Sequence, residues 1–171
     1  MSSGRLRRLP WLVGITLAVI LADRLSKLWV LRHIPYAGAI PVIPNLLRLT
    51  HWLNDGAAFS LFSDAASPAT VRWGLVSFSL VASAAVAYAL CRVAERFSAS
   101  SIALAMILGG ALGNAWDRIL TGAVVDFIEV HIIHYHWPDF NVADSAIVVG
   151  ACLLLLDSLI SGDDKAPQAS E

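Results

Sequence analysis

The sequence predicts an all-α membrane protein with four transmembrane helices and a small β element in its first outer loop. Two features of the composition point this way: 57% of the 171 residues are hydrophobic and only 15% are charged. The mean hydropathy of +0.68 exceeds what a soluble domain of this size needs to form one core. The excess apolar surface is therefore expected to contact lipid.

Four segments are long and apolar enough to cross a membrane, which requires roughly 20 residues. They are residues 11–31, 72–90, 101–120 and 142–160, and no fifth run approaches that length. The first segment follows several arginines, as a secretory signal does, but no small-residue cleavage site ends it. We therefore expect an uncleaved first span and one integral membrane domain over residues 1–171.

The connections between the spans differ in length and composition. Residues 32–71 are rich in Pro, Gly and Asn, and within them Ala39–Ile43 and Leu46–Leu53 favour short strands at the membrane surface. Residues 121–141 are expected to form a second outer loop. The polar tail, residues 162–171, is expected to be disordered.

Lys and Arg near the span ends predict the orientation. One side has Arg5, Arg7 and Arg8 before the first span, two arginines between the second and third, and one lysine after the fourth; the other side has Arg32, Arg48 and Arg72. The three arginines that precede the first span should dominate. Both termini are therefore predicted to be cytoplasmic, and the loops 32–71 and 121–141 to face outward.

Ionisable residues at span ends are costly, so each is a functional candidate. Asp126 follows the third span and Asp144 begins the fourth, so the topology places both carboxylates at the outer face. Asp23 lies about 18 Å along the first helix from Trp11, in the outer half of the membrane. Asn54, in the first loop, also faces outward.

Simpler roles exist for several of these residues. Asn141 and Asp144 are suited to cap the fourth helix, and spacing alone favours this role and a catalytic one equally. Asp23 and Lys27 are spaced i, i+4, which favours an ion pair over catalysis. Asp126, between apolar neighbours, has no such structural explanation. The remaining candidates are Asp117 and Arg118 as interfacial anchors, and Gly109, Gly110 and Gly113, whose small size allows close helix packing.

Other reaction classes find less support. His131, His134 and His136 lie near Glu129, but the stretch lacks a metalloprotease helix motif and Cys partners, so we expect no metal and no cofactor. No serine lies in a recognisable nucleophile turn. With 12 basic and 13 acidic residues the chain has no basic excess for nucleic acid.

Two carboxylates in one site suit peptide hydrolysis without a cofactor, because one can take a proton from water while the other donates to the carbonyl oxygen. The N-terminal end of a helix favours negative charge, so Asp144 is expected to stay ionised. Asp126, in apolar surroundings, is expected to hold the shared proton.

Four motifs and the first-span pair Asp23 and Lys27 together resemble the bacterial lipoprotein signal peptidases, also called signal peptidase II. The order and spacing of the motifs agree with that family over nearly the whole chain. The motifs are NDGAAFS at 54–60, GGALGNAWDR at 109–118, VVDF at 124–127 and FNVADSAI at 140–147.

The resemblance implies an aspartic endopeptidase of the bacterial inner membrane that cuts the signal peptide from diacylglyceryl-modified prolipoproteins, before the lipid-modified cysteine. It implies a small sheet on the membrane and a short helix over the active site, built from residues 33–70. The catalytic dyad would be Asp126 and Asp144. The supporting residues would be Asp23, Lys27, Asn54, Gly110, Asn114, Arg118 and Asn141.

We expect the enzyme to act as a monomer on lipid-modified precursors. The competing classes are a metal-dependent membrane protease, a small transporter and a purely structural four-span protein. A transporter should show repeated or broken spans, and no internal repeat is visible. A structural protein would not need the outer rim of Asp, Asn and Arg.

Overall fold

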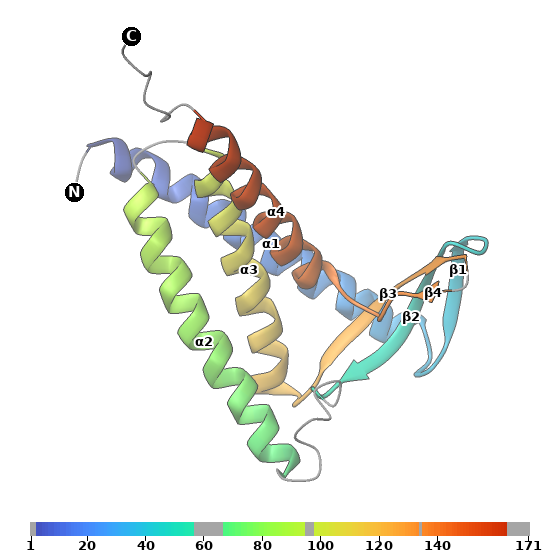
Figure 1. Cartoon of the computed structure of the whole chain (residues 1–171). Helices are drawn as coiled ribbons and strands as arrows, with labels where there is room; N and C mark the ends of the chain where they lie inside the picture. The colour runs from blue at the N-terminus through green and yellow to red at the C-terminus, as the bar shows by residue number, and fades with distance from the viewer. Residues whose placement is uncertain (1–2, 57–66, 95–97, 134, 164–171) are drawn as a thin grey trace.

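The computed structural model describes residues 3–56, 67–94, 98–133 and 135–163. Four long helices form a bundle, and a sheet extends from one end of it (Figure 1). The helices are α1 (Ser3–His33), α2 (Pro68–Val93), α3 (Ala99–Leu120) and α4 (Val142–Asp163). Each is long and apolar enough to cross a membrane, so the predicted fold class is confirmed.

Helix α3 is the central element of the bundle. It packs against each of the other three helices, and half of its most apolar stretch is buried, compared with 17% for the others. Glycines allow the close approach: a Cβ on Gly109 would collide with α1 at the Thr16 carbonyl oxygen, and one on Gly110 with the Ala143 carbonyl oxygen of α4. The packing role predicted for the glycines is thus observed.

Apolar side chains cover the outside of the bundle as well as its core. Trp11, Leu21, Phe78 and Leu156 are all more than half exposed. A soluble protein rarely exposes such a continuous apolar surface, whereas lipid covers it at no cost. The first helix begins, and the last helix ends, at the end of the bundle away from the sheet (Figure 1).

The sheet has four antiparallel strands in the order β1-β2-β3-β4. They are β1 (Ala39–Ile43), β2 (Leu47–Asn54), β3 (Val124–Ile132) and β4 (Tyr135–His136). The first two strands were predicted to within one residue. The short helix expected in residues 33–70 does not appear in 34–56, and the rest of that prediction falls on 57–66, outside the described residues.

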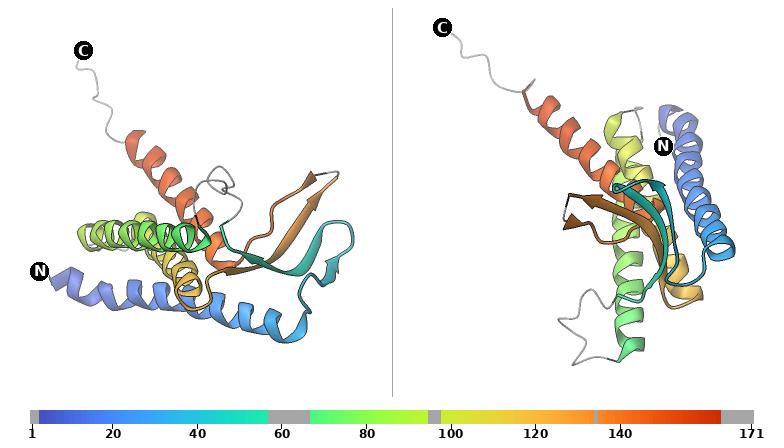
Figure 2. Two further views of the ribbon diagram at one scale, coloured as in Figure 1. Left: turned by 90° about the horizontal axis from the view of Figure 1, so that it is seen from below. Right: turned by 90° about the vertical axis from the view of Figure 1, so that its right-hand side faces the viewer.

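The expectation that residues 121–141 form a loop is wrong. Nine of them form β3, which pairs with β2 from Leu47 opposite Val130 to Asn54 opposite Val124. The strand is buried on both faces near its start: Val125 and Phe127 pack on Val30 of α1, and Val124 and Asp126, on the opposite face, are also buried. A run buried on both faces lacks the alternation that identifies a strand in a sequence. Figure 2 shows the sheet curving away from the helices.

Candidate active site

Asp126 reaches the site because α3 stops sharply and the chain turns into β3. The Thr121 amide caps the helix by donating to the Asp117 carbonyl oxygen at 2.8 Å, and Gly122 adopts a φ of 89°, which favours glycine. Four residues later the Asp126 side chain is 3% exposed. Asn54 Nδ2 donates to one carboxylate oxygen at 2.9 Å, and Asn141 Nδ2 donates to the other at 2.7 Å.

Asp144 lies in the first turn of α4 and forms a capping box with Asn141. The Asp144 amide donates to Asn141 Oδ1 at 3.0 Å, and the Asn141 amide donates back to Asp144 Oδ2 at 3.2 Å. The other oxygen of Asp144 accepts from Asn114 Nδ2 at 2.7 Å. The capping role and a place in the site are therefore compatible.

Neutral amides, rather than cations, hold the two carboxylates. Asn141 contacts both Asp126 and Asp144, and its Nδ2 also lies 3.3 Å from Asn114 Oδ1. Burial raises the pKa of Asp126 to about 6, helped by the nearby charge of Asp144 and opposed by the hydrogen bonds from Asn54 and Asn141. Asp126 is thus suited to carry a proton at a pH where an ordinary aspartate is ionised.

A second cluster of charges lies inside the bundle, next to the amides. Lys27 is fully buried, with Nζ 2.8 Å from Asp23 Oδ2 and 2.7 Å from Asp117 Oδ2, so the predicted Asp23–Lys27 ion pair is present. Arg24 binds the other oxygen of Asp117 at 2.9 Å. Two carboxylates and two cations therefore compensate one another. Asp117 is a buried part of this cluster, not an interfacial anchor.

The two groups are joined at two points. Lys27 Nζ donates to Asn114 Oδ1 at 3.1 Å, and the same amide group donates to Asp144. Asp23 Oδ1 accepts from the Ala143 amide at 3.0 Å, in the turn that carries Asp144. The ion cluster thus fixes the start of α4 and the orientation of Asn114.

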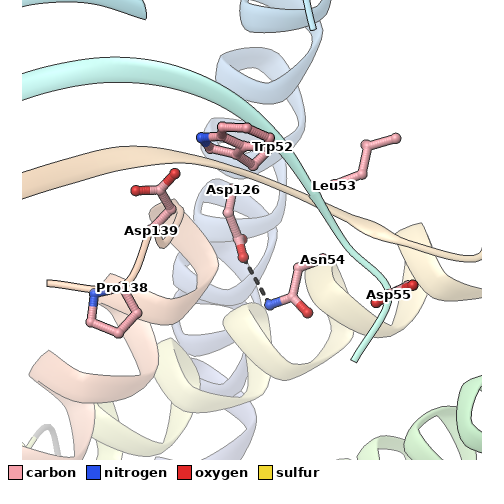
Figure 3. Close-up of a pocket in the computed structure, with 7 residues that line it drawn as sticks. All are labelled: Trp52, Leu53, Asn54, Asp55, Asp126, Pro138 and Asp139. Carbon is pink, nitrogen blue, oxygen red and sulfur yellow. Dashed lines mark hydrogen bonds between the residues drawn. The ribbon is translucent and has the colours of Figure 1, made fainter. Parts of the chain in front are cut away.

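A cleft of about 380 Å³ opens over Asp126, between the strands and the segment that leads into α4 (Figure 3). Asp139 lies across this cleft and accepts from Thr50 Oγ1 at 3.1 Å; its pKa is raised, mainly by burial. Asp139 was not among the predicted site residues, because it belongs to none of the motifs. The residues that line the cleft are Trp52, Leu53, Asn54, Asp55, Asp126, Pro138 and Asp139.

Arg118 lies beside the carboxylates with unused hydrogen-bonding capacity. Its charge interacts with those of Asp144 and Asp126, and one guanidinium nitrogen lies 3.4 Å from the Asn114 carbonyl oxygen. Its Nε is buried without a hydrogen-bond partner among the described residues. A buried donor left in this state is suited to receive an acceptor from a bound molecule.

The nine residues singled out from the sequence thus lie around one centre, in which direct contacts link Asp23, Lys27, Asn54, Asn114, Asn141 and the two carboxylates. Gly110 acts by letting α4 approach α3, and Arg118 lies at the edge. Asp117 is the charged member whose place was missed. Asp117 is 94 residues from Asp23 and 90 from Lys27, so no local sequence pattern links it to them. Only the packing of α1 on α3 brings the three side chains together.

The chain is similar to known proteins along most of its length. The family model described as "Signal peptidase (SPase) II" matches residues 15–160. Lipoprotein signal peptidases of Burkholderia mallei (strain SAVP1) and Burkholderia vietnamiensis (strain G4) are each 44% identical over 150 residues, covering 88% of this chain and 87% of the relative. A solved bacterial membrane enzyme aligns with a TM-score of 0.80 at 28% identity over 95% of each chain.

Proposed function

This chain belongs to the signal peptidase II family and is therefore a protease, and from that premise we propose that Asp126 and Asp144 are its catalytic pair. Its activity is the removal of signal peptides from prolipoproteins, as the name of its relatives states. The observation that carries the assignment is the amide frame: the buried carboxylate of Asp126 and the half-buried one of Asp144, bound by Asn54, Asn114 and Asn141. Amides orient carboxylates without fixing their charge.

The two carboxylates take complementary parts. Asp144, at the start of α4, acts as the base: its carboxylate accepts a proton from water as the water oxygen attacks the scissile carbonyl carbon. Asp126, protonated, donates to the carbonyl oxygen, giving a neutral tetrahedral intermediate. The peptide nitrogen then takes a proton from Asp144 and leaves, while Asp126 recovers its proton as the new carboxyl group forms. No metal or cofactor is required.

Arg118 and Asn54 position the substrate's polar groups at the edge of the site. The guanidinium of Arg118 offers a planar set of donors, of which Nε has no partner among the described residues. Asn54 borders the cleft and already binds Asp126. A peptide carbonyl oxygen in the cleft can therefore lie beside Asn54 and Asp126, with Arg118 offering its donors from beside the two carboxylates.

The substrate reaches this site from the membrane. Residues of β2, β3 and the segment before α4 line the cleft (Figure 3), and the sheet meets the bundle at one end of the apolar helices (Figure 1). Each buried CH₂ of a lipid chain holds a substrate to the bilayer by roughly 0.8 kcal/mol. A diacylglyceryl group on the cysteine after the cut would thus keep the scissile bond near the carboxylates.

We assign the enzyme to the bacterial inner membrane as one integral domain that acts as a monomer. The three arginines in the first turns of α1, Arg5, Arg7 and Arg8, favour a cytoplasmic location of both termini. The sheet and the carboxylates, at the opposite end of the bundle, then face outward, where lipoprotein precursors emerge.

The test uses matched precursor peptides, with and without the diacylglyceryl group, in the same mixed micelles. We expect much faster cleavage of the lipid-modified peptide and a reduced rate in Arg118→Ala, with Arg118→Lys recovering part of it. Arg92→Ala is the matched control, because Arg92 lies near the end of α2 away from the sheet and contacts Tyr88. Equal rates on both peptides would refute lipid recognition, and equal losses in Arg118→Ala and Arg92→Ala would refute the role of Arg118.

A further inference from the structure

Three metal-binding side chains meet on the sheet, away from the amide frame. Glu129 and His131 are two residues apart on β3, so both project from the same side of the strand. His136 on β4 is the cross-strand partner of His131. One ligand atom from each residue lies within 4.8 Å of those of the other two.

The contact between Glu129 and His131 is unlike an ordinary hydrogen bond. His131 Nε2 is 3.0 Å from Glu129 Oε1, yet this nitrogen is buried and makes no hydrogen bond with the described residues. The same geometry is expected of two ligand atoms on one metal ion, because each points at the ion and not at the other ligand. Zinc–nitrogen and zinc–oxygen bonds of about 2.0–2.2 Å place neighbouring ligands only slightly farther apart than this contact.

His136 completes the group from the second strand. Its ring centroid is 4.2 Å from that of His131, with the planes tilted by 56°. The strand β4 has only two residues, and a two-residue pairing is weak on its own. A bond from His136 to an ion held on β3 would therefore fasten the end of this hairpin.

We propose that Glu129, His131 and His136 bind one divalent transition-metal ion, best matched by Zn²⁺, at a site separate from the catalytic carboxylates. Two imidazoles and a carboxylate suit zinc, and a water molecule fills the fourth position. The ion stabilises the β3–β4 hairpin and takes no part in peptide cleavage. The site can thus stand whether or not Asp126 and Asp144 are the catalytic pair.

Arg48 limits the affinity of this site. Its guanidinium binds both oxygens of Glu129, with three contacts of 2.6–2.7 Å. A cation beside the carboxylate repels a metal ion, but each carboxylate oxygen keeps a second lone pair for it. Removal of Arg48 should therefore strengthen metal binding. If Glu129, His131 and Arg48 formed only an ion-pair network, its removal would not create a metal site.

The test is equilibrium dialysis of zinc chloride against the full-length protein in detergent, freed of any affinity tag and previously treated with a chelator. We expect one zinc ion per chain and a higher unfolding temperature with zinc. His131→Gln and His136→Gln should each weaken binding at least about tenfold, the lower end of what loss of a metal's supporting contacts costs.

Two matched variants keep the test decisive. His33→Gln removes an exposed histidine of α1 that contacts the Trp29 carbonyl oxygen and should bind zinc as the parent does. Arg48→Gln should bind it as tightly or more tightly, and circular dichroism should confirm that all variants are folded. No stoichiometric binding by the parent, unchanged binding in the folded His131 and His136 variants, or loss of binding in Arg48→Gln would each overturn the proposal.

Discussion

Two groups of carboxylates lie side by side in this protein, and they are held in opposite ways. Asp23 and Asp117 contact the cations Lys27 and Arg24, whereas Asp126 and Asp144 contact amides. A cation fixes a carboxylate as an anion. An amide orients it and leaves its proton free to move. The first group is therefore structural and the second suits acid and base chemistry.

The largest expected effect follows removal of Lys27. Lys27→Met keeps much of the side-chain volume but leaves Asp23 and Asp117 buried without the cation that they share. This loss should cost about 3–5 kcal/mol of folding free energy. Denaturation in mixed micelles measures this loss. The double variant Lys27→Met with Asp117→Asn should recover part of it. Equal stability of parent and single variant would show that the cluster is not structural.

Neutralising one carboxylate in each group should have effects of opposite sign. The folded-state pKa of Asp126, about 6, exceeds its ordinary value of 3.8, because burial of the ionised carboxylate costs folding free energy. The protein does not bear this penalty below about pH 3.8, where Asp126 is protonated in the folded and the unfolded state. The penalty grows as pH rises and is complete above about pH 6. Asp126→Asn removes this penalty and should stabilise the protein by about 1–3 kcal/mol at pH 8, since one pKa unit corresponds to 1.36 kcal/mol. The gain should vanish near pH 4.

Asp23→Asn is the matched control for this prediction. Asp23 accepts from Lys27 and from the Ala143 amide, so its neutralisation weakens an ion pair and should destabilise the protein at pH 8. Unfolding curves of both variants at pH 4 and pH 8 measure the difference. If both substitutions shift stability in the same direction, the two groups do not differ as described.

A smaller effect is expected from the amide that borders the cleft. The hydrogen bond from Asn54 lowers the pKa of Asp126, so Asn54→Ala should raise that pKa and move the alkaline limb of the cleavage profile to higher pH. The rate at the optimum should fall as well. Thr50→Val, on the same strand, removes a hydrogen bond to Asp139 instead and should leave the limb in place. If the alkaline limb does not move in Asn54→Ala, the limb does not report the titration of Asp126.

The contrast between the groups also explains how much the sequence could predict. Asp23 and Lys27 are one helical turn apart, and Asn141 and Asp144 have capping spacing, so local rules identify both pairs. The strands 39–43 and 47–54 are short runs of apolar and β-branched residues in a region rich in Pro, Gly and Asn, which identifies them as strands. The four spans follow from length and hydropathy alone.

Longer-range features had no such signal. Asp117 joins Lys27 only because glycines let α3 pack against α1, and a sequence does not show which helices are neighbours. The strand β3 is buried on both faces, so its apolar run resembles neither an amphipathic strand nor a span. The motifs that resemble the signal peptidases predict a set of site residues that the structure brings together, although no local pattern links all of them.

We propose that Asp126 and Asp144 perform the chemistry together, and single-turnover cleavage of a lipid-modified precursor tests this proposal. Asp126→Asn and Asp144→Asn should each lower the rate by at least the roughly 10²–10⁴-fold that one acid or base contributes. The double variant should lose little more, because the two act as a unit. Normal precursor binding and a folded bundle are the controls. A folded Asp126→Asn or Asp144→Asn variant that cuts the precursor at a rate close to that of the parent would contradict the claim.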